Sequence, residues 1–149
     1  MEKIKVKFRR MRPGSKVPAY ATDGAAGMDL CACLDEEALL APREIIKVPT
    51  GLAVELPGPH VVAIICARSG LASRYGITLA NAVGVIDSDY RGEIQVPLIN
   101  VGTEPYMIKN GERIAQMLLL PIYLADLVEV AELGPTERGT GGFGSTGTA

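Results

Sequence analysis

Residues 67–72, with the sequence ARSGLA, combine residue types that bind phosphate groups. They follow a short apolar run and begin the one segment that predicts a helix, residues 69–75. A helix N-terminus presents unpaired N–H groups and a positive dipole end to an anion. Arg68 adds a forked cation, Ser69 a hydroxyl group, and Gly70 allows close approach of the backbone. The segment suggests a phosphate site, and the simpler alternative is an ordinary helix start beside a surface arginine.

Residues 81–94, NAVGVIDSDYRGEI, are typical of two strands joined by a polar turn. Asp87 follows the apolar pair Val85 and Ile86, so its carboxylate could orient and activate a water molecule. Tyr90 could present its ring face nearby, and backbone groups of the hairpin could read the edge of a planar base. Taken alone, the segment is more simply a polar turn, because Asp, Ser and Gly are common turn residues.

Two further polar residues lie inside apolar strands, Asp29 and Gln116. Strand alternation would place residues 113, 115 and 117 on one face, with 114 and 116 on the other. A glutamine in such a strand needs a hydrogen-bond partner. Gln116 is therefore either a satisfied core amide or a ligand contact, and the same alternatives apply to Asp29.

The last sixteen residues, 134–149, differ in character from the rest of the chain. Six of them are glycine, and Phe143 is the single large apolar residue. Such a segment buries too little apolar surface to offset the entropy of ordering. We expect residues 1–133 to form the core and residues 134–149 a mobile C-terminal arm. The arm is either a disordered tail or a lid that brings Arg138 and Phe143 to a ligand.

The elements that must position these residues are mostly strands. Apolar residues alternate with polar ones at 4–8, 28–34, 52–56 and 94–98, and a continuous apolar run covers 61–66. Further apolar stretches at 114–120 and 122–130 are separated by Pro121, and residues 35–40 suggest a helical turn or a loop. Many short strands with turns between them predict a single all-β domain: a sandwich, barrel or jelly roll.

Composition narrows the function classes. The chain has 149 residues, of which 48% are hydrophobic, enough to bury a core. Its net charge of −2 argues against a nucleic-acid polymer as the main partner. No apolar run reaches the roughly 20 residues that span a membrane, and no signal peptide is visible, so we expect a cytoplasmic protein. Three cysteines and one histidine, His60 in a turn, make a disulfide framework, a zinc site or a His-based hydrolase poor candidates.

Taken together, five segments resemble, in order and spacing, the five motifs of the trimeric dUTPase family. They are residues 26–30 (AGMDL), 67–72 (ARSGLA), 84–94 (GVIDSDYRGEI), 113–116 (RIAQ) and 138–147 (RGTGGFGSTG). The resemblance implies a β jelly roll, or distorted β-barrel, that assembles as a homotrimer. It also implies three active sites, each shared by all three chains, with the arm closing over a neighbour's site.

The resemblance implies hydrolysis of dUTP to dUMP and pyrophosphate with Mg²⁺ on the triphosphate. Asp87 would deprotonate the water that attacks the α-phosphorus. Asp29 would act on Mg²⁺ through water, or as a structural anchor. The reaction would keep uracil out of DNA and supply dUMP for thymidylate synthesis.

The resemblance also assigns substrate contacts. Tyr90 would pack on the deoxyribose and exclude a ribose 2′-hydroxyl, and uracil would be held by Asn81 and by backbone groups of Val85, Ile86 and Gln95. Phosphate oxygens would be bound by Arg68, Ser69, Gly70 and Gln116. From the arm, Arg138 would act on the terminal phosphates, Phe143 would stack on uracil, and Gly144, Ser145 and Thr146 would contact phosphate. One departure is Ala67, where the family often has proline.

Three other function classes fit the sequence less well. A dCTP deaminase shares the fold and would need a second arginine after the Arg68-Ser69 pair and a glutamate base in the hairpin. Arg74 and Glu93 lie near those positions, but the sequence context of Arg74 does not match, and Asp87 and the Gly-rich tail favour the diphosphatase. A non-catalytic nucleotide-sensing module on the same scaffold is disfavoured by the intact Asp87. An RNA-binding protein with a Gly-rich tail is disfavoured by the net charge and by the single arginine in that tail.

Overall fold

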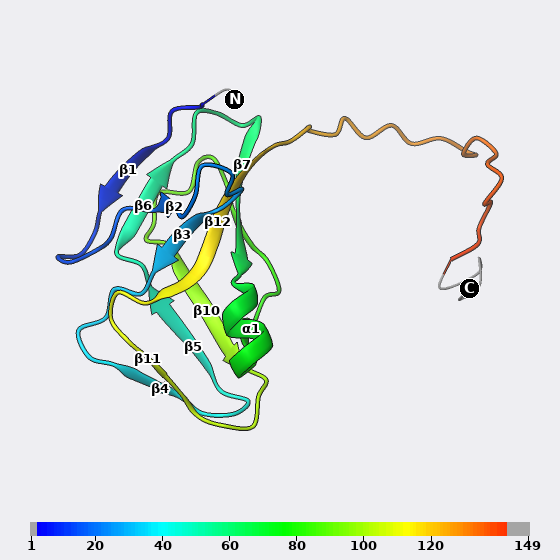
Figure 1. The fold of residues 1–149 in the computed structure, drawn as a ribbon. Coiled ribbons are helices and arrows are strands. Elements are labelled where there is room, and N and C mark those ends of the chain that lie inside the picture. Colours follow the sequence, from blue (N-terminus) through cyan, green and yellow to red (C-terminus); the bar gives the residue numbers. More distant parts are fainter. Residues whose placement is uncertain (1–2, 143–149) are drawn as a thin grey trace.

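The computed structural model describes residues 3–142, which fold mainly into short antiparallel strands (Figure 1). In chain order the elements are β1 (Lys7–Arg10), β2 (Ala19–Tyr20), β3 (Met28–Cys31), β4 (Ala38–Leu40), β5 (Ile45–Pro49), β6 (Leu52–Glu55), β7 (Val61–Ala67), α1 (Ser69–Tyr75), β8 (Ile77–Leu79), β9 (Gly84–Ile86), β10 (Gln95–Asn100), β11 (Tyr106–Ile108) and β12 (Arg113–Pro121).

These strands form four sheets. The largest has five strands in the order β2-β3-β12-β7-β9, and a second has the order β5-β10-β8. The pairs β1-β6 and β11-β4 complete the set, and every pairing is antiparallel. The prediction of an all-β fold is confirmed, although the sheets of the described residues do not close into a continuous barrel.

The hydrophobic core lies between the sheets and follows the pattern that the sequence predicts. Along β10, Val96 and Leu98 are fully buried and alternate with less buried neighbours. Strand β7 lies between β12 and β9, and its residues Val61, Val62 and Ala63 are all buried. A strand covered on both faces needs such a continuous apolar run.

Three local predictions differ from the structure. The first strand begins at Lys7 and not near Ile4, and residues 38–40 of the doubtful 35–40 segment form β4. The apolar stretch 122–130 forms no strand. By contrast, the predicted helix 69–75 coincides with α1, which ends at Gly76 in a left-handed conformation (φ 70°). Since α1 has only seven residues, no helix in the range 3–142 is long enough to cross a membrane.

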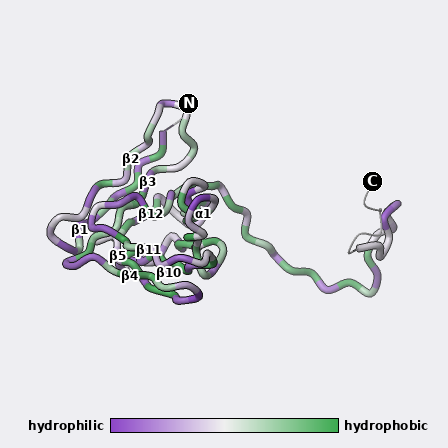
Figure 2. Tube along the Cα trace, turned by 60° about the horizontal axis from the view of Figure 1, so that its bottom comes forward, coloured by the Kyte–Doolittle hydropathy of each residue, from purple (hydrophilic) through white to green (hydrophobic). Residues whose placement is uncertain are grey.

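The chain leaves the sheets after β12 and runs outward as an extended segment (Figure 1). This segment carries apolar residues that the rest of the chain does not cover, as the green stretches in Figure 2 show; Tyr123 is fully exposed. The sheets thus end at Pro121, before the predicted boundary at residue 133 between core and arm, and that boundary stays a prediction.

Candidate active site

One cavity of about 450 Å³ lies beside residues 87–94, the β9–β10 loop. The predicted hairpin is wrong here, because β9 pairs with β7 whereas β10 pairs with β5 and β8 in another sheet. Six of the residues predicted to contact the nucleoside or to activate water line it: Asn81, Val85, Ile86, Asp87, Tyr90 and Gln95. Lys47 and Glu93 line it too. The sequence gives no signal for Lys47, because this residue reaches the cavity from β5 through the pairing of Lys47 with Pro97 of β10.

The β9–β10 loop holds Asp87 and Tyr90 on the same turn. Asp87 follows β9 directly, and its main-chain oxygen accepts the Tyr90 N–H at 3.2 Å. The Tyr90 hydroxyl donates to the Glu93 main-chain oxygen at 2.9 Å. A Cβ at Gly92 would lie 2.6 Å from Tyr90 Cζ, so the ring needs a glycine at this position. The turn therefore places Asp87, which is exposed, and the ring of Tyr90 beside the same cavity.

A second cavity, of about 270 Å³, lies at the start of α1. Its lining includes five of the residues predicted to act on phosphate or metal: Asp29, Arg68, Ser69, Gly70 and Gln116. Nothing lies within 4 Å of the position that a Cβ would take at Gly70. Contacts within this chain therefore do not require glycine there, and the backbone of α1's first turn stays open to a bound group.

Asp29 links two arginines at this cavity. Its Oδ1 lies 3.1 Å from Arg68 Nε, and its Oδ2 lies 3.1 Å from Arg113 Nη1. Arg68 also donates through Nη1 to the Arg113 main-chain oxygen at 3.3 Å. Both carboxylate oxygens of Asp29 are thus engaged with cations, an arrangement that orients the Arg68 guanidinium and screens its charge against that of Arg113.

A β-bulge places Arg113 on the sheet face that carries Asp29. The prediction from strand alternation, that residues 113 and 116 lie on opposite faces, was therefore wrong. Arg113 pairs with Cys31 and Ala115 pairs with Leu30, so Ile114 is the extra residue of β12. Directly paired residues share a face of a sheet, so Arg113 lies on the Cys31 face. Gln116, which pairs with Asp29, lies on that same face. Strict alternation would have put residues 113 and 116 on opposite faces.

Gln116 is held from two sides. Its Nε2 donates to the Ala67 main-chain oxygen at 3.0 Å. A Cβ at Gly27 would lie 2.8 Å from Gln116 Oε1, so glycine leaves the space that this amide oxygen occupies. The amide therefore has a main-chain partner in the chain and also borders the cavity at the start of α1. Of the two alternatives that the sequence left open, the satisfied amide is confirmed, and the ligand contact stays a prediction.

The two cavities lie at opposite ends of β7 and share no lining residue. Ile86 pairs with Ala63, so Asp87 lies level with Val62 near the start of the strand, whereas Arg68 follows its last residue. At about 3.3 Å per residue, these two positions are about 20 Å apart along β7. On a single chain, the candidate nucleoside contacts and the candidate phosphate contacts therefore form two separate cavities.

The remaining candidates lie elsewhere. Arg138 is exposed on the extended segment and lines neither cavity. Phe143, Gly144, Ser145 and Thr146 lie outside the described residues. No cluster of three or more His, Cys, Asp or Glu side chains suited to a metal ion occurs in residues 3–142. The cysteines are free; burial raises the pKa of the Cys31 thiol, which makes it a weak nucleophile.

Comparison with known proteins assigns the family. A family model described as dUTPase matches residues 14–147. A deoxyuridine 5′-triphosphate nucleotidohydrolase of Desulfitobacterium hafniense (strain DSM 10664 / DCB-2) is 55% identical over 147 residues, 99% of this chain and 97% of the relative. The corresponding protein of Neisseria meningitidis serogroup C (strain 053442) is 50% identical over 145 residues, 97% of each chain.

A solved structure supports the same assignment. The dUTPase of Staphylococcus bacteriophage 80alpha with dUPNHPP superposes with a TM-score of 0.89 at 25% identity, covering 98% of this chain and 100% of that chain. The likeness confirms the predicted jelly-roll type of all-β fold. With the family model covering most of the sequence and half of all positions identical to named relatives, the chain belongs to the dUTPase family.

Proposed function

We propose that this protein hydrolyses dUTP to dUMP and pyrophosphate. The observation that carries the proposal is the cavity beside the β9–β10 loop, which is lined by Asp87 and Tyr90 from one turn and by Asn81. Relatives at 50–55% identity over nearly the whole chain bear the name of this activity. In the cell the reaction would keep uracil out of DNA and supply dUMP for thymidylate synthesis.

In this proposal Asp87 is the general base. It accepts a proton from the water that attacks the α-phosphorus, and the bond from that phosphorus to the bridging oxygen breaks to release pyrophosphate. Phosphoryl displacement depends mainly on alignment and charge stabilisation, for which an exposed carboxylate on a fixed turn is suited. Tyr90 packs on the deoxyribose, while Asn81 and backbone groups of β9 and β10 (residues 85, 86 and 95) hold uracil.

The phosphates are bound by the cavity at the start of α1. Arg68 supplies the cation, Ser69 and the backbone at Gly70 supply hydrogen-bond donors, and Gln116 borders the same space. Arg138 acts on the terminal phosphates from the arm. The proposed roles of Phe143, in stacking on uracil, and of residues 144–146, in contacting phosphate, concern positions outside the described residues.

Magnesium fits this site as an ion carried by the triphosphate. Mg²⁺ usually binds through one or two carboxylates together with substrate phosphates and water, and the described residues contain no preformed cluster of ligands. Since both oxygens of Asp29 contact arginines, this residue would reach the ion only through water. When bound, Mg²⁺ neutralises phosphate charge, and Asp29 itself orients Arg68.

The separation of the cavities supports a homotrimer with shared sites. A nucleoside bound at Asp87 of one chain would place its phosphates against Arg68 of another. The exposed apolar segment after β12 supports the same conclusion, because Tyr123, Leu127 and Leu133 are each at least 88% exposed in a single chain. Apolar surface of this extent marks an interface. We propose that it packs on a second copy.

The first test is pyrophosphate release, with Mg²⁺, from dUTP, UTP, dTTP and dCTP, for the wild type and Asp87→Asn. We expect rapid release from dUTP alone and a loss of about 10²–10⁴-fold in the variant. Turnover of Asp87→Asn within tenfold of wild type would refute the base assignment. Ammonia from dCTP would indicate a deaminase, and binding of dUTP without release would indicate a sensing module.

The second test mixes two inactive variants, Asp87→Asn and Arg68→Ala, after brief unfolding and refolding together. If each site takes Asp87 from one chain and Arg68 from another, about a quarter of all sites are intact after random reassembly of the two variants at a ratio of 1:1. Activity near that fraction of wild type is expected. If the mixture stays inactive although mixed oligomers form, the shared-site proposal is wrong.

A further inference from the structure

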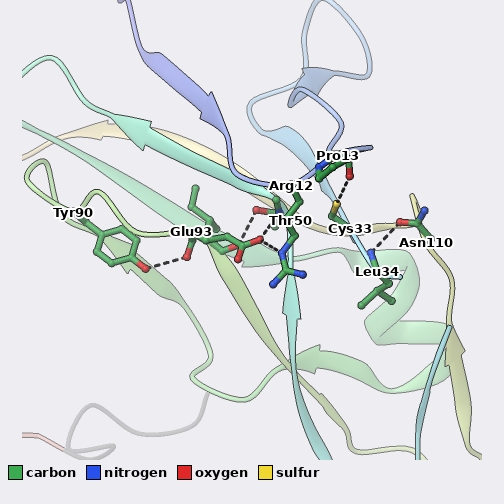
Figure 3. A network of polar contacts seen from close by, with 10 residues as sticks. Arg12, Pro13, Cys33, Leu34, Thr50, Tyr90, Glu93 and Asn110 are labelled. Atoms are coloured by element: carbon green, nitrogen blue, oxygen red, sulfur yellow. Dashed lines mark hydrogen bonds and ion pairs between the residues drawn. The ribbon is translucent and has the colours of Figure 1, made fainter. Parts of the chain in front are cut away.

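The Glu93 carboxylate anchors the β9–β10 loop to the N-terminal part of the chain (Figure 3). Its Oε1 accepts a hydrogen bond from Arg12 Nε at 2.8 Å and another from the Gly51 N–H at 2.9 Å. The Glu93 side chain is only 14% exposed, so this ion pair is better protected from water than the pair between Lys7 and Glu55. Glu93 takes no part in the chemistry proposed above.

The partners of Glu93 are themselves fixed. Gly51 has a positive φ of 71°, and a Cβ there would lie 2.7 Å from Ser15 Cβ, so this turn is tightly packed. The Met11 N–H donates to the Gly51 oxygen at 2.7 Å, next to Arg12 in the chain. The residue after Glu93, Ile94, donates its N–H to the Leu52 oxygen at 2.7 Å. Glu93 is thus held in place through its own side chain and through the main chain of the next residue, Ile94.

Glu93 in turn fixes the ring of Tyr90. The Tyr90 hydroxyl donates to the main-chain oxygen of Glu93 at 2.9 Å, as Figure 3 shows. Tyr90 is exposed, so packing by itself does not hold its ring. The tip of the ring is therefore positioned by the main chain of Glu93, and that main chain is positioned by the contacts of Glu93 with Arg12 and Gly51.

We propose that Glu93, held by Arg12 and the Gly51 N–H, is a positioning residue that sets discrimination between deoxyribose and ribose by fixing Tyr90. The inference rests on the proposed role of Tyr90 as the surface on which the sugar packs. Rejection of a 2′-hydroxyl by a clash requires a wall that does not yield. A ring that is free to move by a fraction of an ångström accommodates the extra oxygen. The ratio of kcat/KM for UTP to kcat/KM for dUTP therefore rises.

The test compares kcat/KM for UTP with kcat/KM for dUTP in Glu93→Gln, Arg12→Met and the double variant. We expect the UTP-to-dUTP ratio to rise about tenfold in each single variant, with no further rise in the double variant because both act on one contact. Lys7→Met, which removes an exposed ion pair of 2.7 Å from the neighbouring strand, is the matched control. Its ratio stays at the wild-type value.

The alternative role for Glu93 is stability alone. In that case activity toward UTP and dUTP falls in the same proportion, the ratio stays within twofold of wild type, and the inference is overturned. Arg12 lies at the surface, so Arg12→Met keeps the test decisive if Glu93→Gln fails to fold. A wild-type enzyme that hydrolyses UTP as fast as dUTP overturns the proposed role of Tyr90 and this inference with it. Pyrophosphate release from dUTP without the ratio change overturns this inference alone.

Discussion

Replacing Asp29 with asparagine tests whether this carboxylate acts on the two arginines or on the metal. The change keeps the shape of the side chain and removes the charge that Arg68 and Arg113 share. Hydrogen bonds to charged groups contribute about 1.5–3 kcal/mol when protected from water, whereas exposed ion pairs contribute about 0–1 kcal/mol. The Asp29 side chain is 17% exposed and so is largely protected from water, whereas the Arg113 side chain is 53% exposed and its pair contributes less. We therefore expect the free energy of unfolding to fall by about 2 kcal/mol.

The effect on catalysis follows from Arg68. Without Asp29 its guanidinium loses the contact at Nε and is repelled by Arg113, so its charge no longer faces the phosphate cavity in a fixed orientation. A loss of about 2 kcal/mol in triphosphate binding corresponds to a fall of about 30-fold in kcat/KM for dUTP. We expect the lower kcat/KM to come mostly from a higher KM, since the contact is made in the bound substrate as well as in the transition state.

The assay measures kcat and KM for dUTP over a wide range of Mg²⁺ concentration. If Asp29 acts on the arginines, the magnesium dependence of Asp29→Asn matches that of wild type, and excess Mg²⁺ does not restore KM. Recovery of wild-type KM at high Mg²⁺ would refute this reasoning and assign Asp29 to the metal's water shell. Glu55→Gln, which removes the exposed ion pair with Lys7, is the control and changes neither quantity.

Three further predictions test the local geometry. Gly27→Ala places a Cβ 2.8 Å from Gln116 Oε1, so we expect a loss of about 1–3 kcal/mol in urea unfolding and a higher KM for dUTP; unchanged values contradict the packing argument. Burial, with Glu112 beside the hydroxyl, raises the pKa of Tyr106. Its stabilising effect is therefore complete below a pH of about 10 and is lost as the pH rises toward the folded-state pKa. In Tyr106→Phe the alkaline fall in urea midpoint becomes shallower, and an equally steep fall would exclude Tyr106 as its source. Because burial raises the pKa of the Cys31 thiol, iodoacetamide should alkylate it more slowly than free cysteine at a pH of about 8, as followed by mass spectrometry; equal rates would contradict this.

The local parts of the fold could be predicted because they depend on neighbouring residues. The helix 69–75 and the turn after Ile86 are both set by the pattern of a few consecutive side chains. The bulge at Ile114 could not be predicted, since the extra residue becomes visible only when β12 is paired with β3. That bulge decides which face carries Arg113, and so the contact between Arg113 and Asp29 escaped strand alternation.

Contacts between distant segments set a second limit. Arg12 and Glu93 are 81 positions apart, and the Glu93 carboxylate meets Arg12 and the Gly51 N–H together. Lys47 likewise reaches the cavity beside the β9–β10 loop through its pairing with Pro97. The residue types predicted which segments line the two cavities, but not which side chains hold those segments in place.

In the proposed trimer, the position of the two cavities links catalysis to assembly. Strand β7 ends at the cavity beside α1, and its partner β9 leads into Asp87 near the start of β7, so the two cavities lie at opposite ends of one strand. The proposal is that a second chain brings its own cavity alongside and completes the site. After β12 the chain continues with apolar residues that are exposed in a single copy. Burial of that segment and completion of the site would then occur together, so we expect a variant that weakens the interface to lose activity without any change at Asp87.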